Sequence, residues 1–227
     1  MKKEKWFTPV NIITAIVIAV LVLSSSVTAT LFDRGAYIRL EEKLDLSKTT
    51  GISEEELLQN YNALIDYNSV FFSGPLVFPT LPMSDTGRIH FSQVKTIFSA
   101  LQISLMISAV LAALLCVLLL RKGRGRFLAF GGILSLMIPA VVGSIMAIVG
   151  WDRFFILFHQ AFFNNNYWIF DAQTDPVILI LPDEFFLDCL VRIIMGIVIS
   201  AILLIVFSAV LQRFWRQRSE NSNLRKI

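Results

Sequence analysis

Four long apolar runs dominate the hydropathy pattern of the chain. They cover about Val10–Leu31, Ile97–Leu120, Phe127–Val149 and Cys189–Leu211. Roughly 20 helical residues cross a bilayer core of about 30 Å, so each run is long enough to span it. The runs lack the alternation that is typical of barrel strands, and a helix satisfies its own backbone in lipid. We therefore predict an all-α membrane protein, a four-transmembrane-helix bundle with a small extracellular cap.

Charge predicts the direction of these spans. The two ends of the chain and the loop 121–126 carry twelve basic residues against Glu4 and Glu220, whereas segments 32–96 and 150–188 carry seven basic and fifteen acidic residues. The positive-inside rule then places both termini in the cytoplasm. In the predicted order, the chain begins with a cytoplasmic end and the first span (1–31), followed by the first cap segment (32–96). The second and third spans with their basic loop come next (97–149), then the second cap segment (150–188). The fourth span and a basic tail complete the chain (189–227).

The first span has an alternative interpretation. A basic start, an apolar run and the small residues around Ala29 also fit a cleavable signal peptide. Because the apolar character continues through Leu31 and Phe32, the run is longer than the apolar part of a typical signal peptide. We therefore favour a membrane span.

Composition excludes most soluble classes of protein. Hydrophobic residues make up 56% of the chain and charged residues 16%, against about 45–50% and about 25% in soluble domains. The net charge of +3 comes from residues that flank apolar spans. This pattern favours contact with an anionic inner leaflet and not with nucleic acid.

The spans themselves contain few polar groups. Arg192, one turn from the outer end of its span, is the single ionisable residue within them, so an ion or proton path is disfavoured. We expect Arg192 to reach headgroups or a cap carboxylate, and Gln102 to form a hydrogen bond between helices. In the third span, small or kinking residues recur every four positions from Gly131, which predicts close helix packing, and Pro139 should bend that helix.

The first cap segment contains one clear helix signal. Ser53 and Glu56 form a capping box, and apolar residues then recur at helical spacing, which predicts an amphipathic helix over about 53–67 that packs on the bilayer or on the bundle. A loop punctuated by glycine and proline follows at 73–82. This loop leads to His90, which precedes the second span.

The second cap segment is unusually aromatic. Residues 151–171 (WDRFFILFHQAFFNNNYWIFD) surround His159 with aromatic rings. Such a stretch can anchor the cap at the membrane surface, with ring bodies in lipid and polar tips in water.

His90 and His159 are the only histidines, and both fall in the cap. Histidine exchanges a proton near neutral pH, which suits acid–base work on an ester or an amine. Ordinary hydrogen-bonded surface histidines are the alternative. A metal site is disfavoured, since the chain has no HExxH motif and no cysteine ligands, and its two histidines and scattered aspartates lack ligand spacing. No GxSxG nucleophile motif and no phosphate-binding glycine loop occur either.

Two motifs carry a resemblance to a known family. "RIHFSQVK" at 88–95 and "FHQAFFNNNYWIFDAQTDPVILILPDEFF" at 158–186 resemble the lipoprotein intramolecular transacylases of Gram-positive bacteria. The resemblance implies an enzyme of the bacterial cytoplasmic membrane with its active face outside. Its substrates would be diacylated lipoproteins in membrane lipid, and it would move the sn-2 acyl chain onto the cysteine α-amine to give the lyso form. No cofactor is implied.

The resemblance also implies roles for residues of the cap. His90 and His159 match the family's catalytic histidines by motif. We expect His159 to take the proton of the amine and His90 to protonate the departing glycerol oxygen or stabilise the oxyanion, and the opposite allocation of the two roles stays open. Departures from the family pattern stand at Gln93, Ala172 and Asp183. Our remaining candidates either line an aromatic pocket or orient a histidine and bind the headgroup: Phe155, Phe162, Phe163 and Trp168 for the pocket, and Arg153, Asn164, Asp171 and Asp175 for the other roles.

Two rival functions remain open from the sequence. The cap could bind a partner or sense pH without catalysis, or the same histidines could serve a membrane esterase that uses water. We expect two distant loops to carry the histidines. Because 69 positions separate them, their proximity depends on the fold and not on sequence spacing.

Overall fold

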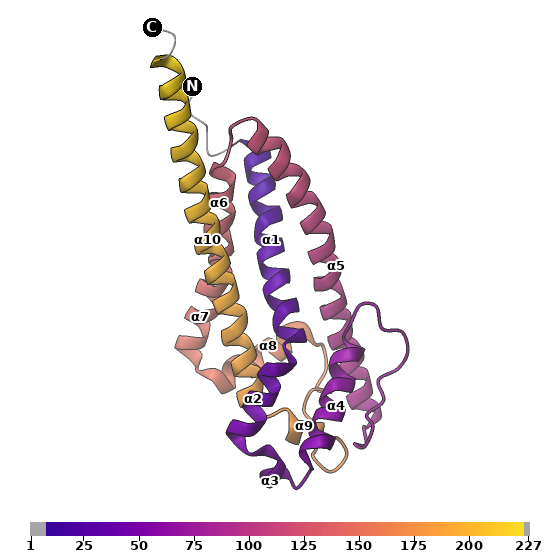
Figure 1. Cartoon of the computed structure of the whole chain (residues 1–227). Coiled ribbons are helices and arrows are strands. Elements are labelled where there is room, and N and C mark those ends of the chain that lie inside the picture. Colours follow the sequence, from indigo (N-terminus) through magenta and orange to yellow (C-terminus); the bar gives the residue numbers. More distant parts are fainter. Residues whose placement is uncertain (1–7, 225–227) are drawn as a thin grey trace. The chain divides into compact units, whose positions relative to one another are not determined.

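A computed structural model of the chain describes residues 8–224 and is helical without strands over that range, as predicted (Figure 1). The helices begin and end in chain order as follows: α1 Pro9–Phe32, α2 Arg34–Leu44, α3 Leu46–Thr50, α4 Glu54–Tyr67, α5 Asp85–Arg121, α6 Arg126–Ser135, α7 Met137–Val149, α8 Trp151–Phe162, α9 Val177–Ile180 and α10 Asp183–Leu224. Five basic residues of the predicted cytoplasmic ends lie outside the described residues: Lys2, Lys3, Lys5, Arg225 and Lys226.

Four helical stretches are long and apolar enough to cross a membrane, as the four apolar runs predicted. They are Pro9–Phe32, Asp85–Arg121, Arg126–Val149 and Asp183–Arg218. The second contains 37 residues, which at 1.5 Å each measure about 55 Å, well over the roughly 30 Å of a bilayer core. The extra length lies at the N-terminal end, because the helix begins at Asp85, twelve residues before the predicted start of the span at Ile97.

The third span is interrupted where its proline requires it. Proline has no N–H and its ring collides with the carbonyl four residues earlier. That carbonyl belongs to Ser135, the last residue of α6, and α7 begins at Met137. The bend predicted at Pro139 is confirmed: the helix is broken between α6 and α7, one turn before the proline.

The chain forms two compact units, and the first consists of residues up to 26, 104–144 and 193 onward. Its core contains Ile18, Phe127 and Ile197. A Cβ on Gly131 of α6 would lie 2.8 Å from Ile18 of α1, and one on Gly132 would lie 2.8 Å from the carbonyl of Ala201 in α10. Close packing of α6 against both helices therefore depends on glycine. Further along the stripe of small residues, Gly143 has open space around it, so the predicted contact does not extend to it.

The second unit consists of residues 27–103 and 145–192 and contains both histidines. Its core is built on Tyr37 of α2 and Tyr61 of α4, whose rings stack at 3.8 Å. The Tyr37 hydroxyl donates to the carbonyl of Ile180 at 3.0 Å. The short helix α9 lies in this core, since Val177 and Ile180 are fully buried.

Helix α4 confirms the helix predicted over 53–67. Ser53 and Glu56 form the capping box through both reciprocal hydrogen bonds. The apolar face of α4, with Leu57 and Tyr61, belongs to the core of the second unit. We expected this face to pack on the bilayer or on the bundle. It packs instead in the core of the cap itself.

Gln102 of α5 also belongs to this unit. Its side-chain amide donates to the carbonyl of Asn68 at 2.8 Å and accepts from the N–H of Val70 at 3.0 Å. We predicted a hydrogen bond from Gln102 to another helix, and this partner was wrong. Gln102 binds backbone groups of the turn that follows α4. A turn that leaves a helix has free backbone groups, and these provide the amide with a donor and an acceptor.

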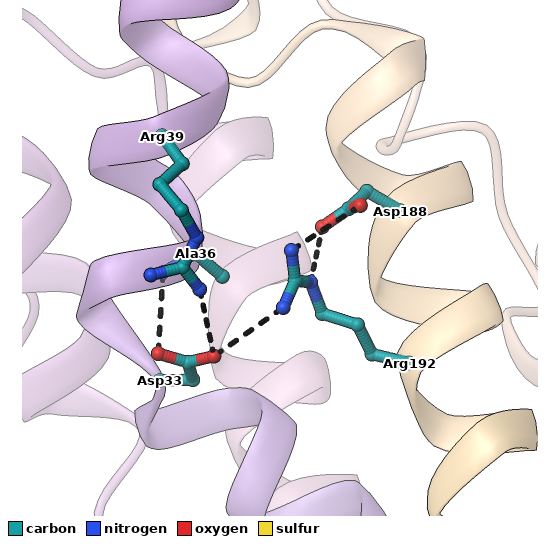
Figure 2. Close-up of polar contacts among 5 residues, drawn as sticks. All are labelled: Asp33, Ala36, Arg39, Asp188 and Arg192. Carbon is teal, nitrogen blue, oxygen red and sulfur yellow. Dashed lines mark hydrogen bonds and ion pairs between the residues drawn. The ribbon is translucent and has the colours of Figure 1, made fainter.

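Arg192 joins the start of α10 to the start of α2 (Figure 2). It pairs with Asp188 one turn earlier, and its Nη1 lies 3.6 Å from Asp33 Oδ2. Asp33 also accepts from the Ala36 N–H at 3.2 Å, which caps α2, and from Arg39 at 3.5 Å. The expected contact of Arg192 with a cap carboxylate is confirmed.

We expect Arg192→Met to lower the free energy of unfolding by about 1–2 kcal/mol, because it leaves two half-buried carboxylates side by side without their shared cation. Thermal unfolding in detergent measures the loss. Arg39→Met is the matched control: its one contact with Asp33 is more exposed, so its cost should stay below about 0.5 kcal/mol. Equal losses in the two variants would contradict a bridging role for Arg192.

Candidate active site

The two histidines of the chain come together in the second unit. Their imidazole centroids lie 6.1 Å apart with the ring planes inclined by 34°. The convergence that the sequence left open is therefore present. The expectation that loops carry both residues was wrong: His90 is in the second turn of α5, and His159 is in the last turn of α8.

His90 is enclosed by aromatic rings. Its side chain is 5% exposed, with the ring of Phe163 at 4.8 Å, that of Phe170 at 5.5 Å and that of Phe91 at 5.7 Å. Its Nδ1 is buried and has no hydrogen-bond partner within the described part of the chain. A buried polar atom without a hydrogen-bond partner lowers the stability of the fold. Its presence therefore points to a functional role of this nitrogen and not to a structural one.

His159 is held in one tautomer by its own helix. Its Nδ1–H donates to the Phe155 carbonyl, one turn earlier, at 2.8 Å. Because a carbonyl can only accept, Nδ1 carries the proton and Nε2 keeps the free lone pair of the neutral ring. Burial lowers the pKa of His159 below its ordinary value of 6.5, although the Phe155 carbonyl and the charge of Asp183 act in the opposite direction. His159 is therefore a neutral base at physiological pH.

Two rings cover the His159 imidazole. Trp168 stacks on it at 4.6 Å with a 29° inclination, and Phe155 lies at 4.2 Å. Trp168 is fixed in turn, since its indole N–H donates to the Asn165 carbonyl at 3.1 Å. Phe155 and Trp168, both predicted to line a pocket, therefore lie against the His159 ring.

Phe163 is the ring that both histidines share. It lies 4.8 Å from His90 and 5.7 Å from His159. Helix α8 ends at Phe162, and Phe163 adopts an extended conformation that turns its ring inward, where it is 6% exposed. Phe162, still helical, is 57% exposed and packs on Phe158 at 4.7 Å.

Three other candidates lie at the surface of this unit. Arg153, Asn164 and Asp171 are exposed, and the Asp171 carboxylate accepts from the N–H of Gln173 at 2.9 Å. Within residues 8–224, neither these three nor Phe162 form a hydrogen bond, ion pair or ring contact with a histidine. A role for them in orienting a histidine has no support in the geometry.

Asp175 supports the helix that carries His90. Its carboxylate is 3% exposed and accepts from the N–H of Ser84, immediately before α5, at 2.8 Å, and from the Thr174 hydroxyl at 2.8 Å. A carboxylate at this position also interacts favourably with the helix dipole. The carboxylate lies so close to Gly87 that a Cβ there would be 2.4 Å from its Oδ1. Asp175 therefore fixes the first turn of α5.

Comparison with known proteins identifies the family. The pattern of the lipoprotein intramolecular transacylase Lit matches residues 12–186. The chain belongs to this transacylase family. The solved structure of the membrane-integral transacylase Lit from Bacillus cereus superimposes with a TM-score of 0.88 at 32% identity, over 92% of this chain and 96% of that one.

Two further structures of the Bacillus cereus transacylase, in which a histidine is replaced by arginine or by alanine, give TM-scores of 0.84 and 0.83 at 31% identity. Both matches cover 92% of this chain, and 93% and 94% of the other. A comparison with curated proteins finds no match. The chain is thus a membrane-integral enzyme of the transacylase class.

Sequence reasoning missed several residues around the histidines of this transacylase. Phe91 and Phe170 were not selected, although Phe91 follows His90 directly and Phe170 belongs to the aromatic segment 151–171. Their rings stack at 5.5 Å. Gln93 was noted only as a departure from the family pattern, yet its side chain accepts from the Asn165 amide at 3.3 Å. Helical spacing of three from His90 was the available signal for Gln93.

We expect Gly87→Ala to reduce transacylation at least tenfold, since the new methyl group displaces the Asp175 carboxylate and with it the start of α5. Tandem mass spectrometry of a diacylated lipopeptide measures the rate. Gly143→Ala in α7 is the control, because a Cβ there meets open space and alanine stabilises a helix relative to glycine. Comparable losses in both variants would show that the effect does not come from Asp175.

Proposed function

We propose that this enzyme moves the sn-2 acyl chain of a diacylglyceryl-cysteine lipoprotein onto the α-amine of the same cysteine, giving the lyso-form lipoprotein. Membership of the transacylase family supports the reaction class. The observation that carries the proposal is the pair of imidazoles 6.1 Å apart within one aromatic cluster. A base and a hydrogen-bond donor at this separation can act on opposite sides of one reacting carbonyl.

The proposed step is an isomerisation. The amine nitrogen attacks the ester carbonyl, a C–N bond forms, the C–O bond to the glycerol breaks, and one proton passes from nitrogen to the glycerol oxygen. Because an amide is more stable than an ester, the transfer is downhill without nucleotide energy. The obstacle is geometric, since amine and carbonyl must meet through a medium-sized ring. Holding two groups in a reactive geometry is worth up to about 7–11 kcal/mol of barrier.

His159 serves as the base in this scheme. Its Nε2 lone pair is free because Nδ1–H is engaged with the Phe155 carbonyl. The buried, neutral ring takes a proton from the attacking amine and returns it to the departing glycerol oxygen. The Phe155 carbonyl then stabilises the imidazolium through the same hydrogen bond.

His90 faces the other side of the reaction. Its buried Nδ1 has no hydrogen-bond partner among residues 8–224, and a ring nitrogen that carries a proton can donate to the oxyanion of the tetrahedral intermediate. A single such donor contributes about 10²–10³ to the rate. The surrounding rings of Phe163 and Phe170 would exclude water, which favours transfer to the amine over hydrolysis.

The proposal includes an orientation. The excess of basic residues at the ends and in loop 121–126 favours cytoplasmic termini, so the second unit would face the outside and take its substrate from the outer leaflet. A cysteine introduced at exposed Gln173 should react with a membrane-impermeant maleimide added to intact cells. Reaction only after lysis would contradict this orientation.

The decisive experiment uses the purified enzyme in vesicles with a synthetic diacylated lipopeptide that carries different acyl chains at sn-1 and sn-2. Since the product is an isomer, tandem mass spectrometry must locate each chain. We expect the sn-2 chain on nitrogen, with no exchange between labelled and unlabelled lipopeptides. Release of free fatty acid would indicate an esterase, and an unchanged lipopeptide would indicate a cap that binds without catalysis.

A further inference from the structure

Asn165, in the turn after α8, forms three hydrogen bonds that connect the surroundings of both histidines. Its side-chain Nδ2 donates to Gln93 Oε1 on α5 at 3.3 Å, and its Oδ1 accepts from the N–H of Tyr167 at 3.0 Å. Its backbone carbonyl accepts from the indole N–H of Trp168 at 3.1 Å. One residue thus contacts the helix of His90 and the ring that covers His159.

We infer that Asn165 and Gln93 form a latch that positions the two histidines relative to each other. The inference rests on the proposed transacylation. Asn165 and Gln93 are positioning residues in this account, because each acts on the reaction through a neighbouring group.

The Gln93 end of the latch lies on the face of α5 that carries His90. Residues three apart on a helix are neighbours on its surface, so a hydrogen bond to Gln93 restrains the helix within one turn of the His90 imidazole. The sequence separation of Gln93 and Asn165 is 72 residues. Local backbone structure therefore does not maintain this contact.

The Asn165 end of the latch fixes the ring on His159. Trp168 stacks on the imidazole at 4.6 Å, and its indole N–H is bound by the Asn165 carbonyl. Phe163, two residues before Asn165, packs beside both imidazoles, with its ring 4.8 Å from His90 and 5.7 Å from His159. Movement of the turn would shift both rings, and with them the separation of the two imidazoles.

The amide pair permits a test based on donor and acceptor complementarity. Gln93→Glu keeps an acceptor for Asn165 Nδ2. Asn165→Asp keeps the bond as well, because the Gln93 amide can turn its NH₂ toward the new carboxylate. The double variant Gln93→Glu/Asn165→Asp opposes two acceptors, both charged, and no hydrogen bond remains.

We expect each single variant to retain transacylation within about threefold, and the double variant to lose about tenfold to a hundredfold in kcat. The loss should appear in kcat more than in KM, because the histidines are displaced while the lipid-facing surface stays unchanged. A merely structural effect would instead be additive across the two single variants. Thermal unfolding of all four proteins in detergent accompanies the kinetics.

Gln93→Met keeps the latch testable if the double variant does not fold. Methionine has a similar length and lacks a strong acceptor, so we expect a reduction in kcat of about tenfold, with activity restored in Gln93→Glu. Full activity of a folded double variant, or of Gln93→Met, would overturn the inference. A wild-type enzyme without transacylation would instead refute the proposed function.

Discussion

His159→Ala and His90→Ala are each expected to slow transacylation by at least about a hundredfold while the protein still inserts and folds. General-base catalysis contributes about 10²–10⁴ to a rate, and one oxyanion donor about 10²–10³. The larger loss should therefore belong to His159. The rate of appearance of the N-acylated isomer, followed by tandem mass spectrometry, measures both losses.

Matched variants separate chemistry from folding. Gln160→Ala changes an exposed neighbour of His159 on α8 and should leave the rate unchanged. His90→Phe keeps a ring against Phe163 and Phe170 but supplies no nitrogen, so it should be as inactive as His90→Ala with better thermal stability. Full conversion by either alanine variant would remove that histidine from the mechanism.

The double variant tests whether the two histidines act on one step. Groups that stabilise the same transition state give strongly non-additive losses. We expect His90→Ala/His159→Ala to be little slower than His159→Ala alone. A double variant slower by the product of both single losses would instead indicate independent contributions.

The spans and the cap helix could be predicted because their signals are local. Twenty apolar residues in a row and the capping box at Ser53 each specify their element without distant partners. The start of α5 could not be predicted in this way. Its first turns, from Asp85 to Thr96, are polar and include Gly87, a weak helix former. They are held by Asp175, whose bond to Ser84 joins positions 91 residues apart.

The site shows the same division between local and distant information. Composition indicated that aromatic rings surround His159, but not which rings. Phe162 and Phe163 are identical in type and adjacent in sequence, yet one is 57% exposed and the other 6% exposed. The difference arises because α8 ends between them. Element boundaries depend on tertiary contacts, so a pattern cannot choose between the two rings.

The second large effect concerns pH. We expect kcat/KM to fall about tenfold per pH unit below the pKa of the lipopeptide amine, near 8, because only the neutral amine attacks. It should fall about a hundredfold per unit once His159 is protonated as well. Burial lowers the pKa of His159 below its ordinary value of 6.5, so the second break should lie on the acidic side of that value. A pH–rate profile in vesicles measures both breaks.

Asp183 provides an independent shift of the acidic break. Its negative charge raises the pKa of His159 and so partly offsets the effect of burial. In Asp183→Asn that opposing effect is absent, the imidazole stays neutral to lower pH, and the break should move further to the acidic side. The break that comes from the amine belongs to the substrate, and it should stay where it is. If the acidic break stayed fixed or moved toward neutral pH in this variant, His159 would not be the base whose protonation limits the rate.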